Sequence, residues 1–365
     1  MMIFRKTSIR TGRKCWLVLC LAFACILLMA GTCIGGETEG PALVDPVGTG
    51  DNYSAVLYNN TNGLPTSEAN TIVQTNDGFI WIGSYGGLVR FDGNRFERMD
   101  STTGIGSVVS LLVDSRDRLW IGTNDNGLAL MEQGGFRLWG EADGLGSDKV
   151  NALVETNDGT LYAGTSEGVS IMTSDLTIRP VELPRNDELA ISQLCSGSDN
   201  LVWGLTREGD IFTLRDGEII DFVDHRETFL PTVTCILPDP DSPEKCYMGT
   251  DDSGLYHGDP RTDDGSMEWV SIEPLSDVSN IQLIRDQIWI SSREGVGVLD
   301  DRGFNCLSGL PMSNSFTHMM ADYEGNLWFA STRQGVMKLV HNRFSDLFAR
   351  YHLPPTVINS TCMLN

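Results

Sequence analysis

The sequence predicts an all-β fold, a seven-bladed β-propeller whose blades each contain four strands. Two observations carry this prediction. A short motif with a Trp or Tyr near a glycine returns about every 40 residues, which is the spacing of propeller blades. The chain of 365 residues also contains 39 glycines. Glycines spread along a chain without helical periodicity are typical of short strands joined by tight turns.

The stretch 76–93 shows one repeat most clearly. Asn76, Asp77 and Gly78 supply a hairpin corner, residues 79–82 form a β-branched and aromatic run too short for a helix, and Gly86-Gly87 turn the chain before a second apolar run. One such unit cannot bury its own apolar faces, so a stable fold needs further copies.

Six further copies follow. The aromatic residues of the seven copies are Trp81, Trp120, Tyr162, Trp203, Tyr247, Trp289 and Trp328. The fourth copy aligns through Val202-Trp203-Gly204-Leu205, with Gly204 in the place of Gly83. Burial of a large aromatic side chain contributes about 2–3 kcal/mol. These side chains are therefore predicted to pack between blades rather than to stack on a ligand.

Further strand-like segments flank each copy. Upstream runs lie at 71–74, 108–113, 151–155 and 316–320, and downstream runs begin at Arg95-Phe96, Gly135-Phe136, Gly303-Phe304 and Arg343-Phe344. A sandwich or barrel would lack a fixed period with the same aromatic residue in the same strand. The pattern therefore favours four-stranded propeller blades.

The two ends of the repeat array predict how the ring closes. Residues 53–58 have the pattern of an outer strand, and such a strand can join the seventh blade so that no open sheet edge remains. Residues 343–348 give another outer strand, and 352–361 copy 63–72. We expect one propeller over 53–341 and the start of a further repeat, in a second propeller, over 342–365.

Residues 1–36 are predicted to be a signal peptide or an uncleaved membrane anchor. Five basic residues within 5–14 precede an uncharged run over 15–36, and a helix of about 20 apolar residues spans a bilayer. Basic residues before such a segment place the following chain outside the cytoplasm, in the periplasm or at the cell exterior. Residues 37–52 are expected to be a linker.

Charge and cysteine content exclude two classes of protein. The formal net charge is −23, which argues against nucleic acid as a partner because a phosphate backbone requires a basic surface. Outside the leader, five cysteines show no Cys-x-x-Cys spacing, so neither a disulfide scaffold nor a zinc site is indicated. Cys235 and Cys246 are predicted to be buried thiols on opposite faces of adjacent strands.

The repeat resembles that of the two-component regulator propeller family. The resemblance rests on Asn62-Gly63-Leu64-Pro65, on 76–83 and on 86–96, and it extends over 53–365. It implies the extracytoplasmic sensor region of a membrane-bound bacterial receptor, as in hybrid histidine kinases and some diguanylate cyclases. The chain contains no kinase histidine segment and no cyclase motif, so the output module is expected in a downstream part.

No motif indicates catalysis, a metal or a cofactor. The histidines, at positions 225, 257, 318, 341 and 352, share no register and no metal-ligand spacing. Turns such as 76–78 and 322–326 resemble calcium loops, but their acidic residues are out of register for that ion. A propeller enzyme of the lyase or lactonase type is the alternative, and it would require a His/Glu pair that converges on the central channel.

The candidate ligand-binding residues lie in the loops between the second and third strands. Two positions before the loop glycine stand Tyr85, Asp125, Ser166, Arg207, Asp252, Arg293 and Arg333. The three arginines predict a basic sector for a carboxylate or sulfate of an anionic small molecule or glycan. The alternative is that they pair with acids such as Glu208 and Glu294 on a solvated rim. A third reading uses these surfaces for protein contacts, including a homodimer.

Overall fold

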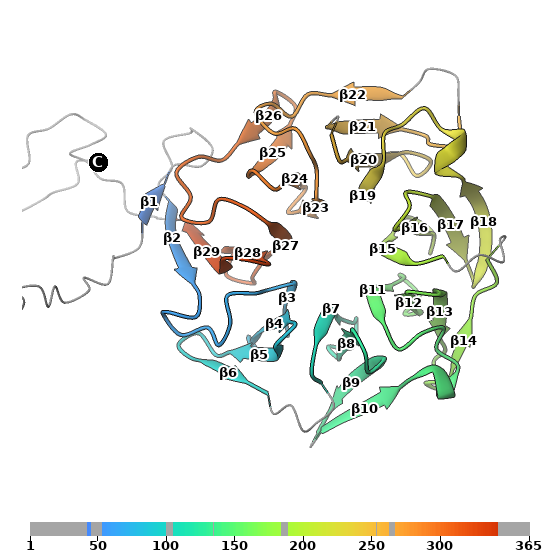
Figure 1. Cartoon of the computed structure of the whole chain (residues 1–365), viewed down its shortest axis with the longest axis horizontal. Coiled ribbons are helices and arrows are strands. Elements are labelled where there is room, and N and C mark those ends of the chain that lie inside the picture. Colours follow the sequence, from blue (N-terminus) through green and yellow to red (C-terminus); the bar gives the residue numbers. More distant parts are fainter. Residues whose placement is uncertain are drawn as a thin grey trace, which may run out of the picture. The chain divides into compact units, whose positions relative to one another are not determined.

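The computed structural model describes residues 42–44, 53–99, 105–133, 135–183, 189–252, 254–262 and 267–341 (Figure 1). These residues form seven antiparallel sheets arranged around a central channel, which confirms the predicted seven-bladed propeller. The predicted N-terminal helix and the further repeat at 342–365 lie outside the described residues. No helix within the described part of the chain is both long and apolar enough to cross a membrane.

Six blades are formed by four consecutive strands each. The strands are β3 (Thr71–Gln74), β4 (Ile80–Ser84), β5 (Gly87–Phe91) and β6 (Phe96–Arg98) in blade one; β7 (Val108–Val113), β8 (Leu119–Thr123), β9 (Leu128–Glu132) and β10 (Gly135–Trp139) in blade two; β11 (Val150–Glu155), β12 (Leu161–Thr165), β13 (Gly168–Met172) and β14 (Ile178–Pro180) in blade three; β15 (Ile191–Ser196), β16 (Val202–Thr206), β17 (Ile211–Arg215) and β18 (Glu218–Val223) in blade four; β19 (Val233–Pro238), β20 (Cys246–Thr250), β21 (Leu255–Gly258) and β22 (Glu268–Val270) in blade five; β23 (Asn280–Ile284), β24 (Gln287–Ser291), β25 (Val296–Asp300) and β26 (Gly303–Cys306) in blade six. Two short 3-10 helices, η2 (Glu141–Asp143) and η3 (His225–Glu227), lie in the linkers after blades two and four.

Blade seven combines the two ends of the described chain. Its inner strands are β27 (Phe316–Ala321), β28 (Leu327–Ser331) and β29 (Gly335–His341), and β2 (Tyr53–Tyr58) pairs with β29 as the fourth strand. The predicted ring closure is therefore confirmed. A fifth strand, β1 (Ala42–Val44), pairs with the outer edge of β2. It lies inside the predicted linker, and its three residues, which stand outside the repeat, carry no sequence pattern that predicts a strand.

The motif glycines lie where neighbouring blades approach most closely. A Cβ built on Gly122 would lie 2.8 Å from the carbonyl oxygen of Val150 in the next blade. A Cβ on Gly83 would lie 2.5 Å from the side chain of Val108, and a Cβ on Gly249 would lie 2.6 Å from the side chain of Val278. Glycine is required at these positions because the first strand of the following blade occupies the space of a side chain.

The repeat aromatics fill the interfaces between blades, as predicted. Trp120 is fully buried and packs with Leu145, Val150 and Ala163 of blade three and its linker. Six of the seven aromatic side chains are buried, whereas Tyr247 is only partly buried and stacks on His257 with ring centroids 4.3 Å apart. These side chains are scaffold residues.

Three of the tryptophans also anchor the turn that precedes their strand. The indole N–H groups of Trp81, Trp120 and Trp328 donate to Thr75, Asp114 and Asp322 at 3.0, 2.8 and 2.8 Å. These bonds satisfy a donor that would be costly to bury alone. They also show that the acidic residues Asp114 and Asp322 stabilise these turns.

Blade four corrects the predicted alignment. Leu205 pairs with the first residue of β17, as Gly122 pairs with the first residue of β9. Leu205, not Gly204, therefore takes the glycine position, and Trp203 takes the aromatic position. The ring of Phe212 occupies the space over Gly204, so this glycine serves packing within its own blade.

The two central cysteines are free and buried, as predicted. Cys235 packs in the interface between blades five and six, and Cys246 packs in the interface between blades four and five. Burial raises the pKa of Cys235 to about 12, so its thiol is neutral at physiological pH.

Replacement of Gly122 by alanine should destabilise the ring. The new methyl group would meet the backbone of blade three, and overpacking of this kind costs about 1–3 kcal/mol. Gly106 is the matched control, because a Cβ there meets no described atom within 4 Å. Gly106→Ala should change stability by less than about 1 kcal/mol. Urea unfolding of the two variants decides; equal midpoints would contradict the packing role of the motif glycine.

Candidate functional site

The predicted ligand-binding residues lie at one end of the blades. Consecutive strands of a blade are antiparallel, so the loops between second and third strands all emerge at the same end as the linkers between blades. We call this end the loop face. Tyr85 is 55 % exposed, and Asp125, Arg207, Asp252, Arg293 and Arg333 are also exposed, whereas Ser166 is partly buried.

Arg293 already has an acidic partner. Its Nε lies 2.8 Å from Oδ2 of Asp277, in the linker between β22 and β23, and this hydrogen bond raises the pKa of Arg293. The rim-pairing alternative thus holds for Arg293, with Asp277 in place of the expected Glu294. Among the described residues, Arg207 and Arg333 form no ion pair.

The loop of blade four differs from the other loops. The backbone N–H of Thr206 donates to the carbonyl of Asp210 at 2.9 Å, as Thr123 donates to Gly127 at 3.0 Å. Asp210 therefore takes the place of the loop glycine. The positive backbone φ moves one residue earlier, to Gly209 with φ of 101°.

This register changes the set of arginines. The position two residues before the glycine belongs to Glu208 in blade four, so the expected equivalence of Arg207 with Arg293 and Arg333 is wrong. An arginine occupies the equivalent position only in blades six and seven. Arg207 lies one residue nearer to β16 and is still exposed on the loop face.

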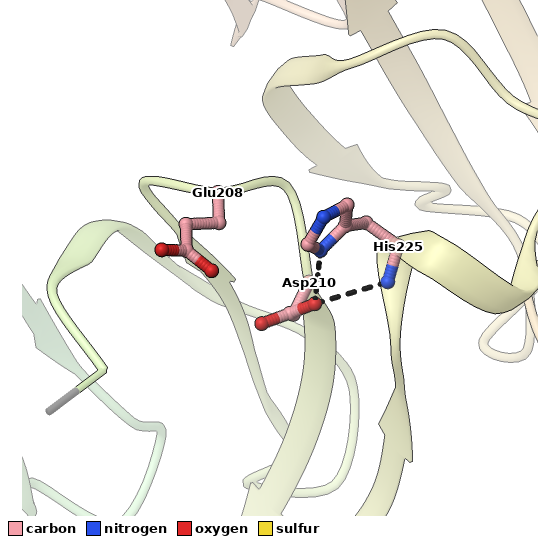
Figure 2. Close-up of side chains that lie close together, drawn as sticks. All are labelled: Glu208, Asp210 and His225. Carbon is pink, nitrogen blue, oxygen red and sulfur yellow. Dashed lines mark hydrogen bonds and ion pairs between the residues drawn. The ribbon is translucent and has the colours of Figure 1, made fainter. Parts of the chain in front are cut away.

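Asp210, Glu208 and His225 form a compact cluster on this face (Figure 2). Asp210 is fully buried, and its Oδ1 lies 2.7 Å from Nδ1 of His225 and accepts the His225 backbone N–H at 3.0 Å. His225 begins η3, so Asp210 holds the linker to blade five against the loop of blade four. Glu208 is exposed, and Figure 2 shows its carboxylate on the same side as the second oxygen of Asp210.

Glu208 and His225 are both candidates from the sequence, but no sequence pattern predicts that they lie together. His225 follows Asp210 by a full hairpin, so no spacing motif links them. The one available signal was Gly209-Asp210-Ile211, where blade four departs from the glycine-apolar pattern of the other copies.

The innermost strands line a central channel of about 970 Å³. His318 is part of its wall, and its Nε2 lies 2.9 Å from Nε2 of Gln282. Gln282 accepts from the backbone N–H of Met319 through Oε1, so its amide NH₂ donates to the imidazole, which must be neutral. The described residues that line the channel include no Asp or Glu, so the His/Glu pair that a channel-centred enzyme would require is not found there.

The fold defines a class of protein, a seven-bladed propeller built from sequence repeats. A sequence profile described as "Two component regulator propeller" matches residues 63–86 and 104–125. Residues 63–86 and 104–125 therefore carry repeats of the two-component regulator propeller type, which confirms the resemblance. No curated protein is similar enough in sequence to match the chain.

Solved structures share the fold. The extracellular domain described as that of hybrid two-component system BT3049 from B. thetaiotaomicron has a TM-score of 0.66 at 18% identity, and the alignment covers 80% of this chain and 42% of that chain. The corresponding domain of BT4673 from the same organism has a TM-score of 0.57 at 19% identity, with 79% and 39% covered. This chain thus spans less than half the length of either domain.

A second group of similar structures consists of lyases. Virginiamycin B lyase from Staphylococcus aureus, solved as a catalytically inactive His-to-Ala variant with quinupristin, has a TM-score of 0.62 at 16% identity. The alignment covers 79% of this chain and 99% of the lyase. At these identities, both groups show the fold alone.

Acid should weaken the fold through His318. Burial lowers the pKa of His318 to about 4, whereas a free imidazole titrates near 6.5. Above about pH 6.5 both folded and unfolded chains are neutral at this residue. As the pH falls from about 6.5 to about 4, His318 becomes protonated in the unfolded chain but stays neutral in the folded chain. The free energy of unfolding therefore decreases over this pH range.

We expect His318 to account for a loss of about 1–3 kcal/mol between these limits. Urea unfolding of the native protein and of His318→Gln, at about pH 7 and at about pH 4.5, measures it. The variant should lose less stability over this interval, because glutamine does not titrate. Parallel losses would show that His318 does not bear this part of the acid sensitivity.

Proposed function

We propose that this propeller is the extracytoplasmic, ligand-binding sensor domain of a membrane-bound signal-transduction receptor of the two-component or diguanylate cyclase type. The match of its repeats to the two-component regulator propeller profile carries the proposal. The structural likeness to domains described as extracellular parts of two-component systems supports it. The output activity would belong to another part of the receptor.

The distribution of variation among the blades supports ligand binding at the loop face. Inside the ring all seven copies share an aromatic side chain in the second strand and the antiparallel pairing of that strand with the third, and four copies share the motif glycine. At the loop positions they place tyrosine, aspartate, serine, glutamate or arginine, and most of these side chains are exposed. Exposed loop residues on a rigid scaffold are where recognition sites usually lie.

The ligand that this face fits best is an anionic small molecule or glycan. Arg293 and Arg333 come from adjacent blades, and Arg207 lies on the same face in a chain of net charge −23. A guanidinium can bind a carboxylate or sulfate through two parallel hydrogen bonds. Asp277 lies 2.8 Å from Arg293, so an anion must compete with this carboxylate, which favours ligands that engage more than one arginine.

Binding of acidic glycans should depend on these arginines. Calorimetric titration with sulfated and carboxylated oligosaccharides is compared between the native chain and the Arg207→Ala/Arg293→Ala/Arg333→Ala variant. Loss of three charged hydrogen-bond donors, each worth roughly 1.5 kcal/mol, should weaken binding by about 1000-fold.

The matched control removes the same charge from the other end of the blades. Arg95, Arg116 and Arg302 are exposed in turns that lie opposite the loop face, and their joint replacement by alanine should leave affinity nearly unchanged. Equal weakening by both triple variants would mean that only net charge matters. An unchanged affinity in the loop-face variant would refute the location of the site.

A lyase is the second candidate, favoured by the near-complete coverage of virginiamycin B lyase. On the loop face, His225 contacts a carboxylate: its Nδ1 lies 2.7 Å from Oδ1 of Asp210. Incubation of the protein with a streptogramin B compound, followed by mass spectrometry, tests this candidate. Product formation that His225→Ala abolishes would replace the sensor proposal with a catalytic one.

A further inference from the structure

We propose that Glu208, Asp210 and His225 form a binding site for a divalent transition-metal cation at the loop face of blade four. The three residues each offer one ligand atom, and these atoms lie within 4.8 Å of one another. The residues converge from two segments, the β16–β17 loop and the start of η3 (Figure 2). This site is separate from the proposed anion binding by arginines.

The environment of the Asp210 carboxylate favours a cation at this place. Its side chain is fully buried, and Oδ1 accepts the backbone N–H and the ring contact of His225. Oδ2 is also buried but has no hydrogen-bond partner among the described residues. A carboxylate oxygen buried without a partner is costly, and a cation or a donor normally satisfies it.

The surroundings direct this oxygen toward the cluster. In Figure 2 the second oxygen of Asp210 points to the side on which the Glu208 carboxylate lies, and the His225 ring stands across from Glu208. The buried carboxylate, the exposed carboxylate and the imidazole thus border one space. Glu208 is exposed and His225 is 34 % exposed, so a solvated ion can reach it.

The ligand chemistry selects the class of metal. Two carboxylates and one imidazole suit Zn²⁺, Mn²⁺ or another first-row divalent ion, which bind at about 2.0–2.2 Å. Calcium requires six to eight oxygen ligands, and the cluster does not supply them. Three protein ligands with an open fourth position are common for zinc. The exposed side chain of Glu208 can close the remaining distance by rotation.

The site exists because blade four has an aspartate, Asp210, at the loop position where the other blades have a glycine. In the other blades a glycine at this position lets the linker pass close to the loop, as at Gly127 and Gly335. Asp210 instead holds the linker through its hydrogen bonds to His225. A bound cation would add a second connection between the loop and η3, and would stabilise the folded state by mass action.

The test is titration of the chelator-treated chain with Zn²⁺ by calorimetry, accompanied by thermal unfolding with and without the ion. The native protein should bind Zn²⁺ and gain thermal stability. Glu208→Gln should weaken binding at least about tenfold, the lower range for disturbed metal sites, and should remove most of the thermal gain. Glu208 is exposed, so this variant is expected to fold.

The matched control is Glu167→Gln. Glu167 is exposed and lies in the corresponding loop of blade three. The residue after it, Gly168, occupies the position that Asp210 occupies in blade four. Its replacement should leave Zn²⁺ binding unchanged. Any zinc held by thiols elsewhere in the chain would contribute equally to both variants and would cancel in the comparison.

A second measurement separates the site from the thiols directly. Mn²⁺ prefers oxygen and imidazole ligands over thiolates, and electron paramagnetic resonance counts the free ion. His225→Gln should release Mn²⁺ that the native chain retains. If the native chain retains no Mn²⁺ and binds no Zn²⁺, or if Glu208→Gln and Glu167→Gln behave alike, the proposal is wrong.

Discussion

The constraint on which the whole structure depends is that no blade can bury its faces alone. Each sheet packs against two neighbours, so the ring is stable only if the last interface is as complete as the others. Pairing of β2 with β29 achieves this, because it makes blade seven from both ends of the described chain. Opening of that pairing would expose two sheet edges and two apolar faces together.

Hydrogen bonds around the channel reinforce the same ring. At every blade junction, a polar side chain at or beside an innermost strand donates to a backbone carbonyl of the next blade; the donors are Asn70, Ser110, Asn151, Gln193, Thr234, Asn280 and Thr317. These bonds satisfy carbonyl groups that the channel wall would otherwise leave in a narrow polar space. They also fix the spacing of the blades, which explains why glycine is needed at Gly122 and its equivalents. Packing and polar satisfaction thus act on the same interface.

The sequence was sufficient to predict the fold because these interface requirements recur. The aromatic side chain of the second strand and the outer strand at 53–58 follow from needs that every blade shares, and the motif glycine recurs in blades one, two, three and five, so periodicity reveals them. The prediction from periodicity failed where a blade fills the interface with a different residue. In blade four, Gly204 lies one residue from the motif position and misled the alignment, since Leu205 fills the place of the glycine. A single sequence shows that a glycine is present, but not which neighbour approaches it. The short strand β1 has no repeated counterpart and could not be inferred.

The same limit explains why the candidate metal site was missed. Repeats identify positions by agreement, whereas a site arises where one copy departs from the others. Asp210 replaces a glycine, and a carboxylate in that buried place must find donors or a cation. His225 supplies a donor for one oxygen, and the second oxygen remains without a partner in the described structure. In blade six, the loop between the second and third strands carries Arg293, which forms an ion pair with Asp277 of the preceding linker. On the loop face, each blade therefore pairs its charged side chains in its own way, although the strands beneath are alike. A functional site is expected where a charged or polar group on this face has no partner.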